Sequence, residues 1–184
     1  MTPTEPSLGL VKVWDRLVRI GHWLLVVLIL LGWLSRHWGH TIHELAGYSA
    51  LLVIAVRIVW GLIGSHHARF KDFIRSPALT IAYAREVLAD TDRRFLGHNP
   101  LGGWMILALL ITTLLVCLSG WLYTTDEYWG VEWVANLHES LTHFLIGLIV
   151  IHVAGVVFSS WRHRENLVSA MFTGKKRAPG AHEN

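Results

Sequence analysis

The histidines are the first feature of this sequence that could support chemistry, since there are 12 in 184 residues. Four of them, His22, His43, His138 and His152, lie within or at the ends of long apolar stretches. An imidazole in such surroundings needs a polar partner, water, or a bound metal or cofactor. Its nitrogens ligate metals and exchange protons near neutral pH. These four residues are therefore the candidate functional residues.

Their spacing predicts two pairs at two depths. His138 and His152 are fourteen residues apart, close to four helical turns, so both project from nearly one face of a helix. Their heights differ by roughly 21 Å at helical rise. His43 begins an apolar stretch at the depth of His138, and His22 lies at the depth of His152. Two ligands of one metal must share a depth, which predicts the pairs His43 with His138 and His22 with His152.

Two histidines at each depth fit haem better than zinc or copper. A tetrahedral zinc site needs three or four protein ligands, whereas haem iron takes two axial ligands. Each histidine taken alone could instead be a hydrogen-bonded packing residue, and His40 is a rival to His43. His143 falls on the opposite face from His152, so we interpret it as a packing or propionate-contact residue. Histidines of the polar segments, such as His66 and His98, are expected to face solvent or lipid headgroups.

One arginine and one glycine share the histidine pattern. Arg57 lies fourteen residues after His43, on the same helix face and at the depth of His22 and His152, where its charge could meet haem propionates. Gly47 lies four residues after His43, where a flat macrocycle would have to approach the backbone. Close packing of helices is the alternative explanation of that glycine.

The elements that must position these residues are membrane-spanning helices. The chain is 53% hydrophobic and only 16% charged, with a mean hydropathy of +0.43, which excludes an ordinary soluble fold. Four apolar stretches, about 17–34, 45–63, 101–123 and 137–161, are long enough to cross a bilayer core of about 30 Å. No linker divides the chain, so we predict an all-α, four-helix transmembrane bundle forming a single domain over residues 1–184. The first stretch has no signal-peptide pattern and is expected to remain in the mature protein.

The basic residues predict the orientation. Six Lys and Arg residues lie between the second and third stretches and five follow the fourth, whereas only Arg36 lies on the opposite side. The positive-inside rule therefore puts the N- and C-termini in the cytoplasm. The connection 65–100 is then cytoplasmic, and Ser76-Pro77 predicts a surface helix at about 77–89. The net charge of +3 fits a membrane lipid surface and does not require nucleic acid.

Several short motifs occur together with these histidines. They are Trp14-Asp15-Arg16 leading to His22-Trp23, His43-Glu44-x-x-Gly47, Arg57-x-x-Trp60-Gly61, and His138-Glu139 followed by His152. The combination resembles the bacterial cytochrome b561 family and the related cytochrome b subunits of nickel-iron hydrogenases, from Trp14 to the basic tail Lys175-Lys176-Arg177.

The resemblance implies two non-covalent haems b, with His22, His43, His138 and His152 as the axial ligands. No Cys-x-x-Cys-His motif for covalent attachment is present. Arg16, Arg19 and Arg57 are expected to raise the potential of the haem nearer the cytoplasm if they reach its propionates. The expected cofactor-binding residues are thus His22, His43, His138, His152, Arg16, Arg19, Arg57 and Gly47.

Membership of this family would imply electron transfer in the bacterial inner membrane, between the quinone pool and a periplasmic c-type cytochrome or redox enzyme subunit. Asp126, Glu127 and Glu132 offer an acidic patch for a basic partner. One alternative is a stand-alone membrane oxidoreductase that uses quinone and a small substrate such as superoxide, which would turn over without a partner. Another is a non-redox transporter or membrane anchor, which would be colourless when purified.

Overall fold

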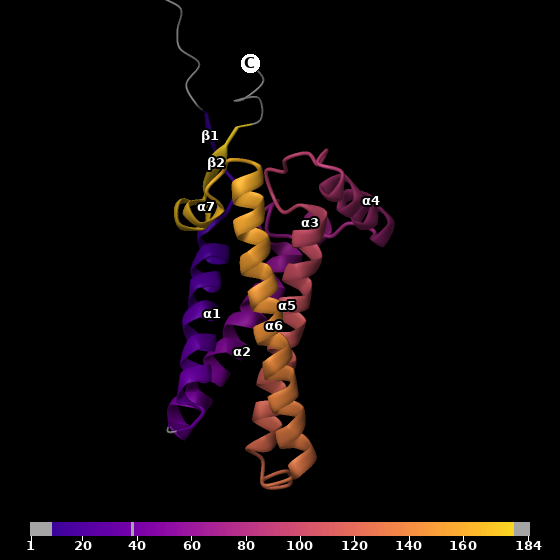
Figure 1. Ribbon diagram of the computed structural model, residues 1–184. Helices are drawn as coiled ribbons and strands as arrows, with labels where there is room; N and C mark the ends of the chain where they lie inside the picture. The colour runs from indigo at the N-terminus through magenta and orange to yellow at the C-terminus, as the bar shows by residue number, and fades with distance from the viewer. Residues whose placement is uncertain (1–8, 38, 179–184) are drawn as a thin grey trace, which may run out of the picture.

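Four long helices make up most of the structure (Figure 1). The computed structural model describes residues 9–37 and 39–178, and residues 1–8, 38 and 179–184 lie outside that description. The long helices are α1 (Arg16–Ser35), α2 (His40–Ile63), α5 (Pro100–Tyr123) and α6 (Glu132–Arg162). Each is long and apolar enough to cross a membrane, with mean hydropathies from 1.9 to 2.4. The predicted four-helix membrane fold is confirmed, although α2 and α6 each begin five residues earlier than predicted.

The helices run alternately up and down, and α2 packs on both α1 and α5, which in turn packs on α6. The upper end in Figure 1 carries the first and last described residues together with the short helices α3 (Phe70–Phe73), α4 (Pro77–Leu88) and α7 (Leu167–Thr173). We call this the terminal end. The opposite end holds the connection between α1 and α2 and the one between α5 and α6, and we call it the far end.

The outer surfaces of the long helices are strongly apolar. Only 6% of the most apolar part of α1, and the same share of α6, is buried within the protein. Side chains such as Leu52 and Val150 remain more than 60% exposed. Monomeric soluble proteins rarely expose apolar patches of more than a few hundred Å². A surface of this kind is therefore covered by lipid.

Polar residues begin the helices on the terminal end. Asp15 caps α1 by accepting a hydrogen bond from the Val18 backbone N–H at 2.9 Å. Asn99 caps α5 in the same way, accepting from Gly102 N at 2.7 Å, and Pro100 follows at the first helical position. Ser76 and Pro77 repeat the arrangement at α4, over the residues for which the sequence predicts a surface helix. Each cap satisfies a backbone donor that the first turn leaves without a partner.

A small antiparallel sheet joins the two ends of the described chain. β1 (Leu10–Lys12) pairs with β2 (Lys175–Arg177) in the register Leu10 opposite Arg177. The strands have three residues each, too short to be predicted by alternation of apolar and polar residues. Gly174 adopts the left-handed conformation, with φ 78°, and its carbonyl accepts from the backbone of both Val13 and Trp14.

Ion pairs attach the connection between α4 and α5 to the end of α6. Glu165 is paired with Arg94 at 2.6 Å and with Lys176 at 3.1 Å. Asp92 likewise pairs with Arg162 at 2.6 Å. Burial alone would raise the pKa of Glu165, but the hydrogen bond from Arg94 and the charge of Lys176 hold it below its usual value. This network attaches the α4–α5 connection and β2 to the end of α6.

Candidate functional site

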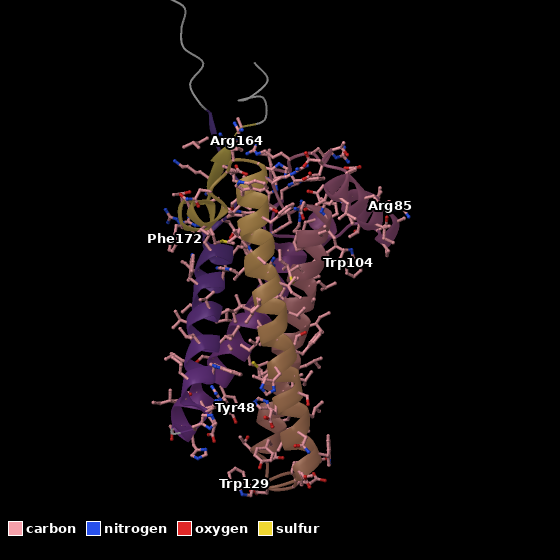
Figure 2. All side chains as sticks on the ribbon, viewed as in Figure 1. Tyr48, Arg85, Trp104, Trp129, Arg164 and Phe172 are labelled. Carbon is pink, nitrogen blue, oxygen red and sulfur yellow. The ribbon has the colours of Figure 1, made fainter. Side chains whose placement is uncertain are left out.

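The structure brings His43 and His138 together toward the far end of the bundle. His43 lies in the first turn of α2 and His138 in the second turn of α6. The centroids of the two imidazole rings are 6.0 Å apart, with an interplanar angle of 78°. Tyr48, labelled in Figure 2, lies on α2 in the same half of the bundle, where its hydroxyl bonds to Thr124 Oγ1 at 3.1 Å. That bond attaches α2 to the end of α5.

Backbone carbonyls determine which nitrogen of each ring is free. His43 Nδ1 lies 2.9 Å from the carbonyl oxygen of Gly32 on α1. His138 Nδ1 lies 3.1 Å from the carbonyl oxygen of Val116 on α5 and 3.1 Å from Ser119 Oγ. A carbonyl oxygen only accepts, so both Nδ1 atoms carry the proton and both Nε2 atoms keep a lone pair. This is the tautomer in which a histidine ligates a metal through Nε2 while a second group orients its ring.

The distance between the two rings fits one iron held between them. A metal–imidazole bond is about 2 Å long and the ring centroid lies roughly 1 Å behind the nitrogen, so two axial ligands have centroids about 6 Å apart. The observed 6.0 Å agrees with this. Among the described residues no group of three or more His, Cys, Asp and Glu side chains is placed to hold a metal ion. A pair of imidazoles at this distance fits a cofactor that brings its own equatorial ligands.

Two glycines leave space at this pair. A Cβ on Gly120 would lie 3.0 Å from Cε1 and 3.3 Å from Nδ1 of the His138 ring, so only glycine allows the ring its present position. A Cβ on the partly buried Gly47 would meet nothing within 4 Å, which leaves open space one turn from His43. This space is what the approach of a flat macrocycle requires.

The second pair lies nearer the terminal end. His22 on α1 and His152 on α6 are both partly buried and lie within electrostatic range of each other. His152 follows His138 by fourteen residues of one continuous helix, so the two pairs are separated by roughly 21 Å along its axis. His22 Nδ1 is buried and has no hydrogen-bond partner. The ligation of one iron by each pair stays a prediction.

Arg57 lies on α2 at this second level and is 7% exposed. Its Nη2 donates to the Ala68 carbonyl at 3.2 Å, and its guanidinium lies 5.1 Å from the centroid of the Phe70 ring. Its Nη1 is buried without a partner. A buried guanidinium nitrogen with no acceptor is costly, so it indicates an anionic or polar group that the chain binds at this point.

Four buried side-chain nitrogens of the described residues have no partner, and all four belong to the terminal half of the bundle. They are His22 Nδ1, Trp23 Nε1, Arg57 Nη1 and His98 Nδ1. An unsatisfied buried polar group costs about 1–3 kcal/mol. Their grouping fits the polar edge of a cofactor with carboxylate side chains, such as haem, at the level of His22 and His152.

Arg16 and Arg19 lie at a groove between α1 and α7. Arg16 is exposed, and Arg19 Nε donates to the Met171 carbonyl at 3.2 Å. The groove has a volume of about 540 Å³, and Trp23 stacks on Phe172 within it at a centroid distance of 4.3 Å. The structure thus brings the two arginines together at the surface of α1, where they flank an apolar cavity.

Asp15 links the two motifs Trp14-Asp15-Arg16 and Trp60-Gly61 through hydrogen bonds. In addition to capping α1, its carboxylate accepts hydrogen bonds from Trp60 Nε1 at 2.9 Å and from Ser65 Oγ. Burial raises the pKa of Asp15, but the bonds from Ser65, Val18 and Trp60 outweigh it and hold the pKa below its usual value. A Cβ on Gly61 would overlap the Phe70 ring at 2.2 Å. These residues fix α1 to the end of α2, which carries Arg57.

Three residues near the histidines were not predicted from the sequence. Ser119 and Gly120 lie in the apolar third span, where a small polar residue beside a glycine was a usable signal. His98 was expected to face solvent or headgroups, but it is only partly exposed and its Nδ1 is buried. Its ring packs against Trp14 at a centroid distance of 4.4 Å and against Phe73 at 4.9 Å. Burial, with Arg57 and Lys176 nearby, lowers the pKa of His98 to about 3.

Known proteins match the part of this chain that contains the candidate residues. A family model described as prokaryotic cytochrome b561 matches residues 13–174. A probable Ni/Fe-hydrogenase B-type cytochrome subunit of Azotobacter vinelandii is 26% identical over 72% of this chain and 65% of its own length. One from Bradyrhizobium diazoefficiens is 24% identical over 91% of this chain and 86% of its own length. The chain spans just under two thirds of the Azotobacter relative. No solved structure matches the chain.

The family match extends over both histidine pairs and over all four apolar helices. The chain is accordingly a multi-pass protein of the bacterial inner membrane, and its family is one of haem b proteins that transfer electrons in membranes. The resemblance inferred from the sequence is confirmed, and the chain belongs to the prokaryotic cytochrome b561 family.

Proposed function

We propose that this protein binds two haems b and transfers electrons across the membrane, between the quinone pool and a periplasmic redox partner. The observation that carries the proposal is the His43/His138 pair, whose rings are 6.0 Å apart with each Nδ1 donating to a backbone carbonyl. A second pair, His22 and His152, lies at the other depth of the same bundle. A bound haem b supplies a reversible one-electron centre.

The side chains around each pair have separate tasks. Gly32 and Val116 orient the rings of His43 and His138 through their carbonyl oxygens and keep each Nε2 available to iron. Arg57 supplies a buried positive charge at the level of His22 and His152. A positive charge near a haem favours its reduced form, because reduction adds an electron. We therefore expect Arg57 to raise the potential of the haem held there.

The orientation follows from charge. The terminal end carries the basic loop residues and the Lys175-Lys176-Arg177 strand, so the positive-inside rule assigns it to the cytoplasm. The far end is then periplasmic. It exposes Asp126, Glu127 and Glu132 beside Trp129, which is 68% exposed and labelled in Figure 2. An acidic rim with an exposed aromatic residue suits a basic redox partner.

The names of the relatives suggest what that partner is. Both are described as B-type cytochrome subunits of a Ni/Fe-hydrogenase. A redox enzyme subunit or a c-type cytochrome that docks at the far end would exchange electrons with the haem held by His43 and His138, which is the nearer of the two.

The groove between α1 and α7 is the candidate quinone site. Its volume of about 540 Å³ is within the usual range of ligand pockets, about 300–1,000 Å³. Trp23 lines it and its ring lies 5.1 Å from the ring of His22. Arg16 and Arg19 at its rim are donors that a quinone carbonyl oxygen could accept from. Phe172, labelled in Figure 2, closes it from α7.

The test of the haem assignment is a reduced-minus-oxidised spectrum with pyridine-haemochrome quantification on protein purified in mild detergent. Two b haems per chain are expected, and one in the His43→Ala or the His152→Ala variant. His66→Ala is the matched control, because His66 is an exposed histidine of the terminal end. A folded protein without haem, or one whose haem content is unchanged by both ligand substitutions, would contradict the proposal.

The test of the quinone site is the rate at which a quinol analogue reduces the purified protein. Arg16→Leu should slow this reduction at unchanged haem content. Arg85→Leu is the control, since Arg85 is an exposed arginine of α4 on the same end of the protein and away from the groove (Figure 2). Equal rates in the two variants would exclude this groove as the site.

A further inference from the structure

His98 is partly buried at the terminal end, and its Nδ1 atom is fully buried, although the residue comes from a loop. It directly precedes Asn99, the residue that caps α5. Its ring lies between the rings of Trp14 and Phe73, which are 6% and 4% exposed. A loop histidine with no task would be expected to remain in solvent, because burying a polar group without a partner is unfavourable. The enclosure therefore needs an explanation.

Two buried side-chain nitrogens in this part of the protein lack a hydrogen-bond partner. Both His98 Nδ1 and Arg57 Nη1 are buried and unpaired. The two side chains lie within electrostatic range of each other, and His98 lies within range of His152 as well. The ring contacts agree with this, because Arg57 lies over Phe70, Phe70 packs on Phe73, and Phe73 packs on His98.

The charges at this point favour an anion. Arg57 and Lys176 both act on His98 and oppose its protonation, and burial acts in the same direction. Lys176 is neutralised by Glu165 at 3.1 Å and also donates to the Phe95 carbonyl at 3.1 Å. Arg57 Nη2 is satisfied only by a neutral carbonyl, that of Ala68. The Asp15 carboxylate acts on Arg57 from a distance without a hydrogen bond to it, so Nη1 of Arg57 still lacks an acceptor that a bound carboxylate would supply.

We propose that His98 and Arg57 together hold one propionate carboxylate of the haem whose iron His22 and His152 ligate, with His98 donating from Nδ1. This inference rests on the proposed function, because it requires a haem at that pair. It assigns a cofactor-binding role to a residue outside the histidine pattern of the spans. The carboxylate would be the acceptor that His98 Nδ1 and Arg57 Nη1 both lack.

The experiment compares wild-type protein with the variants His98→Leu and His98→Gln, and with His66→Leu as the matched control. His66 is an exposed histidine of the same terminal end. Haem loss to an excess of apomyoglobin, both midpoint potentials, and the redox-induced infrared spectrum of haem labelled with 13C at the propionate carboxylates are recorded. The component absent in His152→Ala identifies the haem concerned.

His98→Leu should lose that haem roughly ten- to a hundredfold faster than wild type, because a hydrogen bond to a charged group contributes about 1.5–3 kcal/mol. Its midpoint potential should fall and its labelled carboxylate band should shift. The haem at His43/His138 should keep its potential, which shows that the bundle is folded. His98→Gln, which keeps an amide donor, should retain the haem better than His98→Leu.

The outcomes separate the two proposals. A wild-type protein without two haems overturns the proposed function and this inference with it. If the wild type holds two haems but His98→Leu equals His66→Leu in haem loss, midpoint potential and carboxylate band, only the role of His98 is overturned. Should His98→Leu lose both haems by misfolding, His98→Phe decides, since it keeps an aromatic ring between Trp14 and Phe73 but has no donor, and a carboxylate band unchanged from wild type in that variant overturns the inference.

Discussion

Gly120→Ala gives the sharpest test of how the bundle positions an axial ligand. The added methyl group would lie 3.0 Å from Cε1 of His138, whereas carbon atoms in ordinary contact are about 3.5–4.0 Å apart. The ring must therefore retreat by a few tenths of an ångström. It cannot do so freely, because its Nδ1 is held by the Val116 carbonyl and by Ser119 Oγ, each at 3.1 Å.

That displacement exceeds what a metal bond tolerates. Metal–ligand distances are kept to about ±0.2 Å, and changes to the groups that orient a ligand typically cost 10–100-fold in affinity. We expect the haem at His43/His138 to be lost about 10–100-fold faster, which corresponds to about 1.4–2.7 kcal/mol. The haem at His22/His152 should be unaffected. The helix itself should not suffer, since alanine is better than glycine in a helix interior by roughly 0.5–1 kcal/mol.

The assay is haem transfer to apomyoglobin, followed by optical spectroscopy, with Gly147→Ala as the control. Gly147 is on α6 and a Cβ there would meet nothing within 4 Å. If Gly120→Ala retains both haems as long as Gly147→Ala does, with unchanged midpoint potentials, the reasoning about ring position is refuted.

Three further predictions concern charges. Arg57→Leu should lower the midpoint potential of the haem at His22/His152 and leave the other in place, and redox titration showing both potentials unchanged would exclude the proposed role. Asp15→Ala should lower the free energy of unfolding by about 0.5–2 kcal/mol through loss of the α1 cap. Because the native pKa of Asp15 lies below its ordinary value, the stabilisation is complete above about pH 4 and declines as the pH falls through the native pKa. The thermal melting temperatures of the wild type and Asp15→Ala should therefore converge in acid. A difference that stays constant with pH would contradict this. Glu165→Gln should destabilise the terminal end by on the order of 3 kcal/mol, because it leaves Lys176, which is 4% exposed, as an uncompensated buried charge. Proteases should then cleave the connection 65–100 faster in Glu165→Gln than in the double variant Glu165→Gln/Lys176→Met. Equal cleavage rates would argue against the ion pair.

The spans and the histidine depths were predictable because both depend on local periodicity. Apolar length alone identifies a membrane helix, and a fixed rise per residue converts the fourteen-residue offset of His138 and His152 into a depth. The position of Arg57 on the face of His43 follows from the same rule. The predictions of haem number, quinone and partner remain proposals.

Contacts between helices could not be predicted in the same way. The carbonyls that fix the tautomers of His43 and His138 belong to Gly32 and Val116, on other helices, and every residue carries a carbonyl, so no pattern marks them. The His138 ring can approach this carbonyl because the residue one turn later is Gly120, where a Cβ would lie 3.0 Å from the ring. Such complementarity exists only after α5 and α6 have packed.

The sequence by itself determined a four-helix membrane protein with paired histidines at two depths, since hydropathy and helical geometry act on neighbours along the chain. The tertiary structure alone decided that His98, from a polar loop, is enclosed by Trp14 and Phe73, and that Arg16 and Arg19 lie at a groove on α1. It also decided the pairing of β1 with β2. The physical reason is that each of these depends on residues distant in sequence, whose approach is driven by packing and by satisfaction of buried polar groups.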